Sequence, residues 1–379
     1  AEALAEHGLT QVITGVPHYP WWRKIRDHSD ENYLQGKNNL EIRRVNHPVP
    51  KNNSNLVRAI MELVFGLRAG FLIHRDVGVV VLVSPAMISS AMVKTILKLR
   101  RRRAKVVVWV QDLYEQGLSE TGSKKGFLSQ IIVRTENWLL ANSDFVIFAH
   151  PTFIRAKGLD LSNPNLIAIP NWSQFKYSPT ADSSAVREKY QLGNERLVLH
   201  IGNMGVKQGL EYVIQAAKLA HEEDCAIRFI FLGGGNQLSN LKELACNLSN
   251  VTFIDPVQDD ELANLLASSD VLLVHEKPGV REMSIPSKLT TYFQTGKPVV
   301  ICSESDSIAG KMILENDLGL WVQSGNPEAL LKTIHELDLE QAALFGIKAK
   351  AYAEKSMSKD VALTRFIEVL ESKKRSITD

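Results

Sequence analysis

The sequence is poor in the features that mark several protein classes. Its three cysteines, Cys225, Cys246 and Cys302, are odd in number and far apart, which suits neither a disulfide framework nor a zinc site and indicates a reducing compartment. No run of roughly 18 uncharged apolar residues is present, so no membrane-spanning helix is expected, and no signal peptide is visible. The apolar share of 45% and the charged share of 23% are normal for a globular protein. We therefore expect a cytoplasmic protein with two domains.

The net charge of +2 is small but unevenly distributed along the chain. Residues 1–172 hold 22 Lys and Arg against 14 Asp and Glu, a net +8, whereas the remainder holds 22 against 28, a net −6. Two apolar helical stretches in the basic part, 56–75 and 86–97, carry arginines or lead into the basic run "KLRRRRAK" at 98–105. Such segments are typical of helices that lie against an anionic bilayer; the alternative is a buried helix followed by a solvated basic turn.

If these helices do lie against a bilayer, the basic N-terminal domain has an anionic membrane surface as a partner. Four consecutive arginines, Arg100 to Arg103, would then hold the protein peripherally on the inner face of the plasma membrane, without a spanning helix. No nucleic-acid partner is expected.

Apolar runs of strand length alternate with helical patterns almost throughout the chain, which predicts an α/β fold with parallel strands buried on both faces. Periodicity lapses at residues 169–184, so we expect two doubly wound domains at 1–172 and 173–357, with a final helical segment in 358–379. The first helical pattern, closed by Gly8, precedes the strand near Val12. A parallel domain would normally open with a strand, and we therefore expect that an N-terminal strand and the loop after it are missing from this sequence, with an unusual start of the fold as the alternative.

A glycine-rich turn follows the apolar run Leu197–Ile201 and precedes a helical pattern: "LVLHIGNMGVKQGLEYVIQAA", residues 197–217. A turn between a strand and a helix start offers backbone amides and the positive end of a helix dipole to an anion, so phosphate is the expected ligand. The spacing of Gly202, Gly205 and Gly209 fits neither a Walker A loop nor the dinucleotide fingerprint. Glycines that serve only a tight turn are the alternative.

Several segments, taken in order, resemble the motifs of the family 4 retaining glycosyltransferases, and most of all bacterial exopolysaccharide enzymes of the colanic-acid type. They are "TGVPHYPWW" (14–22), "VQDLYE" (110–115), "IPNWS" (169–173), "GNMGVKQGLE" (202–211), "FLGGG" (231–235) and "IPSKLTTYFQTGKPVV" (285–300). The resemblance implies the GT-B fold, in which two Rossmann-like domains face a cleft. The N-terminal domain would bind the acceptor, the C-terminal domain the nucleotide sugar, and the final helix would return to the N-terminal domain.

The resemblance also implies a donor site in the second domain. Its expected residues are Gly202, Asn203, Gly205, Lys207, Gly234, Val257, Ser287, Lys288 and Thr291. Many relatives have basic residues where this chain has Asn203 and Gln208, which leaves Lys207 as the only cation of the loop. Thr291 stands where many relatives have the glutamate that grips the ribose, and this puts the ribose contact in doubt. Val257 and Gly234 have ordinary loop and turn roles as alternatives.

Three residues carry the expected catalysis: Asp112 near the reacting sugar, Lys207 at the leaving diphosphate, and Glu282 on the donor hydroxyls, with Met283 the other candidate for the last position. His18 and Tyr19 would line the acceptor side. Capping or turn roles remain the alternative for Asp112, and a surface position for His18. In such a mechanism no metal and no cofactor is expected, because lysine and backbone dipoles stabilise the leaving group.

The resulting prediction is a retaining hexosyltransferase that moves a sugar from a nucleotide diphosphate sugar to a lipid-linked or oligosaccharide acceptor in bacterial surface polysaccharide synthesis. The first alternative is a non-catalytic nucleotide-sugar-binding or scaffold protein of a polysaccharide assembly complex. The second is a nucleotide-sugar epimerase on the same fold. The sugar, the base (UDP, GDP or TDP) and the linkage stay open.

Overall fold

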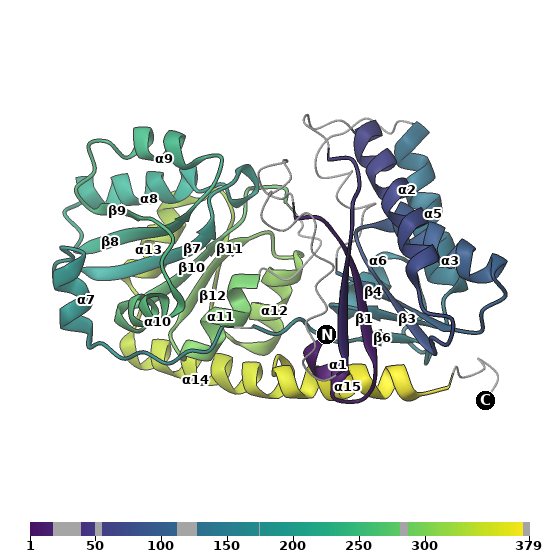
Figure 1. Ribbon diagram of the computed structural model, residues 1–379. Helices are drawn as coiled ribbons and strands as arrows, with labels where there is room; N and C mark the ends of the chain where they lie inside the picture. The colour runs from purple at the N-terminus through teal and green to yellow at the C-terminus, as the bar shows by residue number, and fades with distance from the viewer. Residues whose placement is uncertain (18–38, 50–54, 112–126, 174, 281–286, 374–379) are drawn as a thin grey trace. The chain divides into compact units, whose positions relative to one another are not determined.

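The computed structural model describes residues 1–17, 39–49, 55–111, 127–173, 175–280 and 287–373. The chain forms two compact units (Figure 1): unit 1 consists of Ala1–Ile169 and Leu363–Asp379, and unit 2 of Pro170–Ala362. Unit 2 is therefore one continuous segment between the two parts of unit 1. The boundary lies between Ile169 and Pro170, whereas the sequence put it after residue 172.

Unit 2 is built on a six-stranded parallel sheet of order β12-β11-β10-β7-β8-β9. The strands are β7 (Arg196–Asn203), β8 (Ile227–Gly234), β9 (Val251–Ile254), β10 (Val271–His275), β11 (Val299–Ser303) and β12 (Leu320–Gln323). Successive residues of β7 serve two different cores: Leu197 and Leu199 join one apolar cluster and Val198 the other. The sheet is thus buried on both faces, and the predicted α/β class is confirmed.

Helices cover both faces of this sheet. They are α7 (Ser183–Lys189), α8 (Glu211–Glu222), α9 (Leu238–Leu244), α10 (Asp259–Ser268), α11 (Ser287–Thr295), α12 (Ile308–Asn316), α13 (Pro327–His335) and α14 (Leu339–Ser356), with the short 3-10 turn η2 (Val206–Gln208) after β7.

Strands β7 and β10 pair over a short stretch and then diverge. Their register covers only Val198 with Val271 and Leu199 with Leu272. Beyond this point the hydroxyl of Tyr292, a fully buried residue of α11, accepts a hydrogen bond from Ile201 N–H (2.9 Å) and donates to the carbonyl of Leu273 (3.3 Å). A side chain therefore replaces the missing rung between the two strands.

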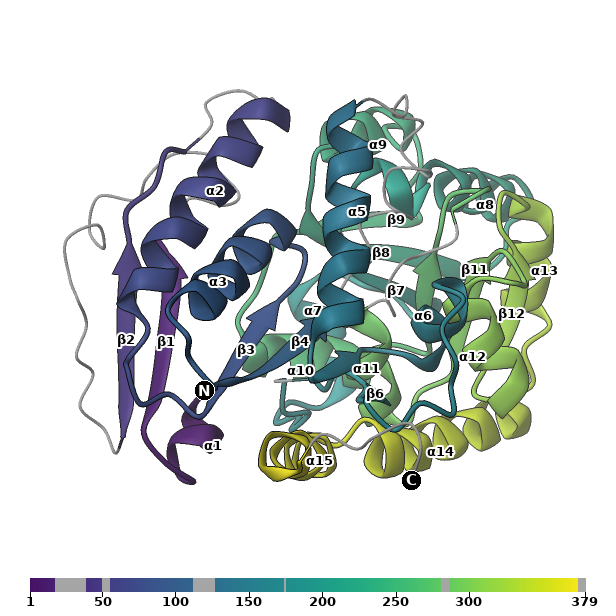
Figure 2. The same cartoon turned by 90° about the vertical axis from the view of Figure 1, so that its right-hand side faces the viewer.

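Unit 1 contains a parallel sheet of order β3-β4-β5-β6 and a separate parallel pair, β1-β2. The strands are β1 (Thr10–Gly15), β2 (Leu40–Val45), β3 (Val79–Val83), β4 (Lys105–Val110), β5 (Phe145–Phe148) and β6 (Leu166–Ala168); the helices are α1 (Glu2–Ala5), α2 (Asn55–Leu72), α3 (Met87–Leu99), α5 (Phe127–Asn142) and α6 (Pro151–Ala156). Figure 2 shows α2 and α3 side by side.

Helix α15 (Lys359–Glu371) follows unit 2 in the chain, and its residues from Leu363 onward belong to unit 1. The ammonium group of Lys105, at the start of β4, donates to the carbonyls of Val369 (3.1 Å), Leu370 and Ser372 (2.7 Å). The indole of Trp109 meets the ring of Phe366 edge to face, with the ring centroids 5.0 Å apart. The last helix is thus fixed to a strand of the first sheet.

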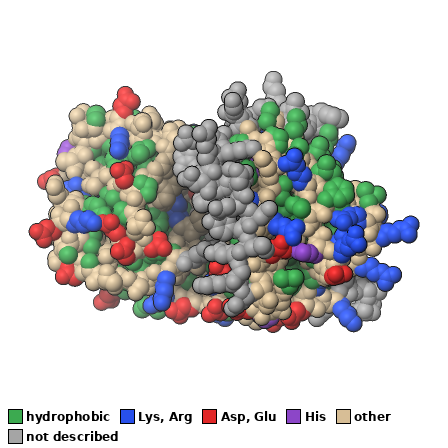
Figure 3. Space-filling view, viewed as in Figure 1, with side chains coloured by type: hydrophobic (Ala, Val, Ile, Leu, Met, Phe, Trp, Pro, Cys, Tyr) green, Lys and Arg blue, Asp and Glu red, His purple; other side chains and the backbone are tan. Residues whose placement is uncertain are grey.

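Helix α2 leaves an apolar stripe uncovered. Ile60, Leu63, Leu67 and Phe71 recur at helical spacing and are each more than 40% exposed. In the face drawn in Figure 3, apolar side chains lie over the position of α2, and basic side chains gather on the same unit. Among the described ranges, no helix is long and apolar enough to cross a membrane.

The basic run after α3 has a structural task. Arg100 donates to the carbonyls of Gly70 (3.3 Å) and Phe71 (3.2 Å), and Arg102 to those of Ile73 (3.2 Å) and His74. Two of the four consecutive arginines therefore donate to carbonyls at the end of α2 and just beyond it. The last carbonyls of a helix find no N–H donor within the helix itself. Arg101 and Arg103 are exposed.

Candidate functional site

The candidate site lies in unit 2, where its strand order reverses. The chain leaves β7 toward β8 on one side of the sheet, and β10 leads toward β11 on the other. In open α/β sheets the crevice beyond the carboxyl ends of two such strands is the usual ligand site. The glycine loop Gly202–Gly209 begins with the last two residues of β7, and the segment Glu276–Gly279 follows β10, so both lie at the carboxyl ends of these strands.

Two glycines give the loop its course. Gly202 and Gly209 have positive φ angles of 98° and 54°, and a Cβ on Gly209 would lie 2.8 Å from the Cα of Lys277. The loop therefore packs against the segment after β10 at a distance that only glycine permits. In addition, Lys277 N–H donates to the carbonyl of Lys207 (2.8 Å).

The loop amides behave differently from what the sequence suggested. Met204 N–H donates to the carbonyl of Gly234 (2.8 Å), Gln208 N–H to that of Gly205 (3.2 Å) and Gly209 N–H to that of Val206 (3.3 Å). Gly205 N–H donates to Oε1 of Gln208 (3.1 Å). Four amides of the loop expected to face an anion are thus paired within the unit, and the lysines are the remaining candidates to bind an anion.

Asn203 and Gln208 build the loop where many relatives have cations. Oε1 of Gln208 accepts from Gly205 N–H and, at 3.4 Å, from Nδ2 of Asn203. The two amide side chains therefore close the turn on itself, and the adjacent Lys207 side chain is exposed.

The second lysine stands on the first turn of α11. Nζ of Lys288 lies 3.2 Å from Nε2 of His200, a fully buried residue of β7. An ammonium group only donates, so Nε2 of His200 accepts and the imidazole is neutral. Burial, and then the charge of Lys288, hold the pKa of His200 well below its usual range.

A second buried histidine ends β10. Nδ1 of His275 lies 2.7 Å from the carbonyl of Gln208, which can only accept, so this nitrogen carries a proton. Burial is the main cause that lowers the pKa of His275 to about 4, and the charge of Lys288 adds to it. The site thus combines lysine ammonium groups with neutral histidines, an arrangement suited to an anion.

The other predicted donor residues occupy varied positions. Gly234 accepts the hydrogen bond from Met204, Val257 packs against the core, and Ser287 begins α11. Oγ1 of Thr291 lies 3.3 Å from Oγ of Ser173. Four further predicted residues, Asp112, Glu282, His18 and Tyr19, lie outside the described residues and stay predictions.

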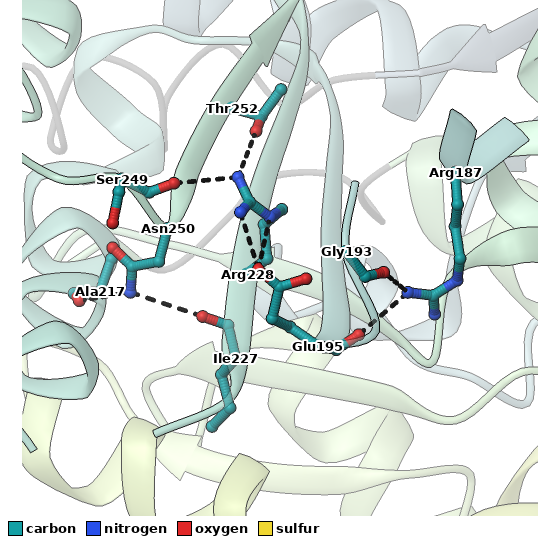
Figure 4. Close-up of polar contacts among 9 residues, drawn as sticks. All are labelled: Arg187, Gly193, Glu195, Ala217, Ile227, Arg228, Ser249, Asn250 and Thr252. Carbon is teal, nitrogen blue, oxygen red and sulfur yellow. Dashed lines mark hydrogen bonds and ion pairs between the residues drawn. The ribbon is translucent and has the colours of Figure 1, made fainter. Parts of the chain in front are cut away.

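Structural polar contacts lie at the other end of the same sheet, where its strands begin (Figure 4). The guanidinium group of Arg228 binds Oε1 of Glu195 at 2.7 and 3.2 Å, and Arg187 donates to the carbonyls of Gly193 (2.6 Å) and Glu195 (3.1 Å). Nδ2 of Asn250 donates to the carbonyl of Ala217 (2.8 Å). These contacts lie at the amino ends of the strands, and the candidate functional groups lie at the carboxyl ends.

Residues 195–338 match the family described as Glycosyl transferases group 1. This segment is a group 1 glycosyltransferase domain. The domain includes the glycine loop, both lysines and both buried histidines.

Similarity extends beyond the glycosyltransferase domain. The chain is 29% identical over 386 aligned positions to WcaI of Escherichia coli (strain K12), whose name describes a glycosyl transferase of colanic acid biosynthesis; the match covers 97% of this chain and 93% of the relative. This confirms the resemblance to the colanic-acid type.

Solved structures show the same fold. HepE of Anabaena, in complex with UDP and glucose, is 16% identical with a TM-score of 0.67 over 88% of this chain and 87% of its own. Sucrose-phosphate synthase of Thermosynechococcus elongatus is 16% identical with a TM-score of 0.74 over 97% and 90%. The chain therefore has the GT-B fold.

Proposed function

We propose that the protein is a retaining glycosyltransferase that uses a nucleotide diphosphate sugar as donor. The observation that carries the proposal is the pair of lysines at the strand-order reversal of the group 1 domain: Lys207 after β7 and Lys288 at the start of α11. Two ammonium groups beside neutral histidines match a diphosphate in charge. HepE, a structural neighbour, was solved with UDP and glucose.

In the proposed reaction the acceptor oxygen bonds to the anomeric carbon while the bond from that carbon to the diphosphate breaks. The leaving diphosphate oxygen takes the acceptor proton on the same face, so configuration is retained and no protein nucleophile is used. Lys207 and Lys288 stabilise the charge that develops on the leaving group. Glu282 would hold donor hydroxyls, and Asp112 with His18 and Tyr19 would serve the acceptor.

Binding of nucleoside diphosphates tests the donor site. We expect Lys207→Ala and Lys288→Ala each to weaken nucleotide binding by about 1.5–3 kcal/mol, because a charge-assisted hydrogen bond is lost. The ligand is whichever of UDP, GDP and TDP the wild type binds most tightly. Lys218→Ala, on exposed α8 surface with Glu222 as its partner, is the matched control and should leave affinity unchanged. Unchanged affinity in both site variants would refute the donor site.

A non-catalytic nucleotide-sugar-binding protein is the second candidate. It is favoured by Thr291, whose hydroxyl faces Ser173 at the position where many relatives have a ribose-gripping glutamate. Both candidates predict nucleotide binding, so the deciding measurement is release of nucleoside diphosphate from the sugar donor in the presence of a lipid-linked saccharide. Release that requires the acceptor identifies the enzyme, and binding without release identifies the alternative.

We also propose that the acceptor belongs to surface polysaccharide synthesis and is reached at an anionic membrane. The support is the exposed stripe of α2 together with Leu99, which is 76% exposed, and the exposed Arg101 and Arg103 beside it. An apolar face flanked by basic residues binds an anionic interface both by burying apolar side chains and by electrostatic attraction.

Vesicle co-sedimentation tests this surface. We expect binding to phosphatidylcholine vesicles that contain phosphatidylglycerol, weaker binding without it, and release at high salt, where charges are screened. Phe71→Ser and the double variant Arg101→Ser/Arg103→Ser should each reduce binding. Leu314→Ser, an exposed leucine of unit 2, is the control. Failure of the wild type to bind at low salt would favour a soluble acceptor.

A further inference from the structure

We propose that two buried histidines, His200 and His275, are positioning residues that hold the two lysines of the phosphate site. The inference rests on the proposed donor site and extends it to residues that do not themselves touch the ligand. His200 holds Lys288 directly, and His275 holds the backbone that carries Lys207.

The case for His275 starts from the turn η2. The carbonyls of two successive residues, Lys207 and Gln208, are bound by the end of β10: one by Lys277 N–H (2.8 Å) and the other by Nδ1 of His275 (2.7 Å). The imidazole is only 2% exposed and stacks on the ring of Tyr212, with centroids 5.9 Å apart. Its donor is therefore fixed in direction, and it sets the position of the Lys207 backbone.

The case for His200 concerns the side chain of Lys288. A lysine is a flexible four-carbon stem with three donors. One donor is taken by Nε2 of His200, which fixes the ammonium group near the strand ends. The low pKa of His200 keeps the acceptor nitrogen unprotonated, so the two groups attract.

Preorganisation is the physical gain. A side chain that is already immobilised loses less conformational entropy when the ligand binds, and immobilising a free one costs about 0.5–1.5 kcal/mol. Preorganised lysines therefore strengthen the binding of phosphate in particular. Loss of a buried histidine that served packing alone would weaken the binding of phosphate and of the rest of the nucleotide alike.

The experiment uses the full chain and two ligands, the preferred nucleoside diphosphate and the corresponding nucleoside. His275→Asn keeps a donor near the position of Nδ1, and His200→Gln keeps an acceptor near that of Nε2; His275→Leu and His200→Leu keep neither. We expect each Leu variant to lose about tenfold in diphosphate affinity, the equivalent of 1.4 kcal/mol, with nucleoside affinity unchanged. The Asn and Gln variants should restore most of the loss.

Several outcomes would overturn the inference. Equal losses for nucleoside and diphosphate would show a general structural role, and so would Asn and Gln variants as weak as the Leu variants. If the Leu variants do not fold, His275→Gln, which displaces the donor, is compared with His275→Asn, and equal affinities refute the proposal. If Lys207→Ala and Lys288→Ala weaken binding while the histidine variants do not, this inference fails and the donor site stands.

Discussion

Removal of one buried hydroxyl tests how the diverging ends of β7 and β10 are joined. Tyr292→Phe keeps the ring in its fully buried position and deletes only the oxygen that joins Ile201 N–H to the carbonyl of Leu273. Burial raises the pKa of Tyr292 above its usual range, so the hydroxyl stays protonated and makes both hydrogen bonds. The variant leaves a buried amide without this acceptor.

The expected cost follows from that amide. A buried donor left unsatisfied costs about 1–3 kcal/mol. For a unit of this size each kcal/mol lowers the thermal midpoint by roughly 2–4 °C, so the fall should be about 2–12 °C. Hydrogen exchange of the Ile201 amide should also become faster, because the strand ends beside the glycine loop lose their bridge.

The assays are thermal unfolding and hydrogen exchange of the segment that contains Ile201. Tyr352→Phe is the matched control, since the hydroxyl of this half-buried tyrosine makes no hydrogen bond with the part of the chain that the structure describes. An unchanged midpoint and unchanged exchange in Tyr292→Phe would refute the bridging role, and equal effects in both variants would do the same.

Three further predictions concern the interior, acidity and metals. Lys157→Met should destabilise the protein by about 3–5 kcal/mol, because the fully buried carboxylate of Glu136 loses the ammonium group of Lys157. In denaturant unfolding, the double variant Lys157→Met/Glu136→Met should lose less stability than Lys157→Met alone, and an additive loss would contradict this. The pKa of His275 is about 4 in the folded protein and about 6.5 in the unfolded chain. Between about pH 6.5 and about pH 4, His275 is therefore protonated in the unfolded chain and neutral in the folded protein. The free energy of unfolding should therefore fall by about 3 kcal/mol as the pH falls through this window, with a flatter slope in His275→Asn; equal slopes would be inconsistent with the shift. Turnover should persist in excess chelator, and a complete, metal-restorable loss would count against the proposed charge stabilisation by lysine.

The strands could be predicted from sequence wherever burial on both faces makes them almost entirely apolar, as in Leu197–Ile201, where His200 is the exception. Strand β2 could not, because Glu41, Arg43 and Arg44 occupy it and it belongs to a two-stranded, half-buried sheet. Its polar residues hide the pattern that a buried strand would show.

The motifs of the candidate site could be recognised in the sequence, but its contacts could not. The glycine loop and Lys288 are visible as motifs, whereas the loop amides turned out to be paired through Gly234 and Gln208. The histidine contacts join residues 67 and 88 positions apart in sequence, and such pairs arise only from the fold. A histidine near the end of an otherwise apolar strand was the one available signal.

The three carbonyls bound by Lys105 have a consequence for the order in which the protein matures. Unit 2 is continuous and can acquire all its contacts as soon as its own residues are available, but β4 of unit 1 receives α15 only after the ribosome has added some 260 further residues. Chains fold from the amino terminus during synthesis, and contacts of such separation form late. Until then, Trp109 lacks the ring of Phe366 against it. The unit synthesised first is therefore the one completed last.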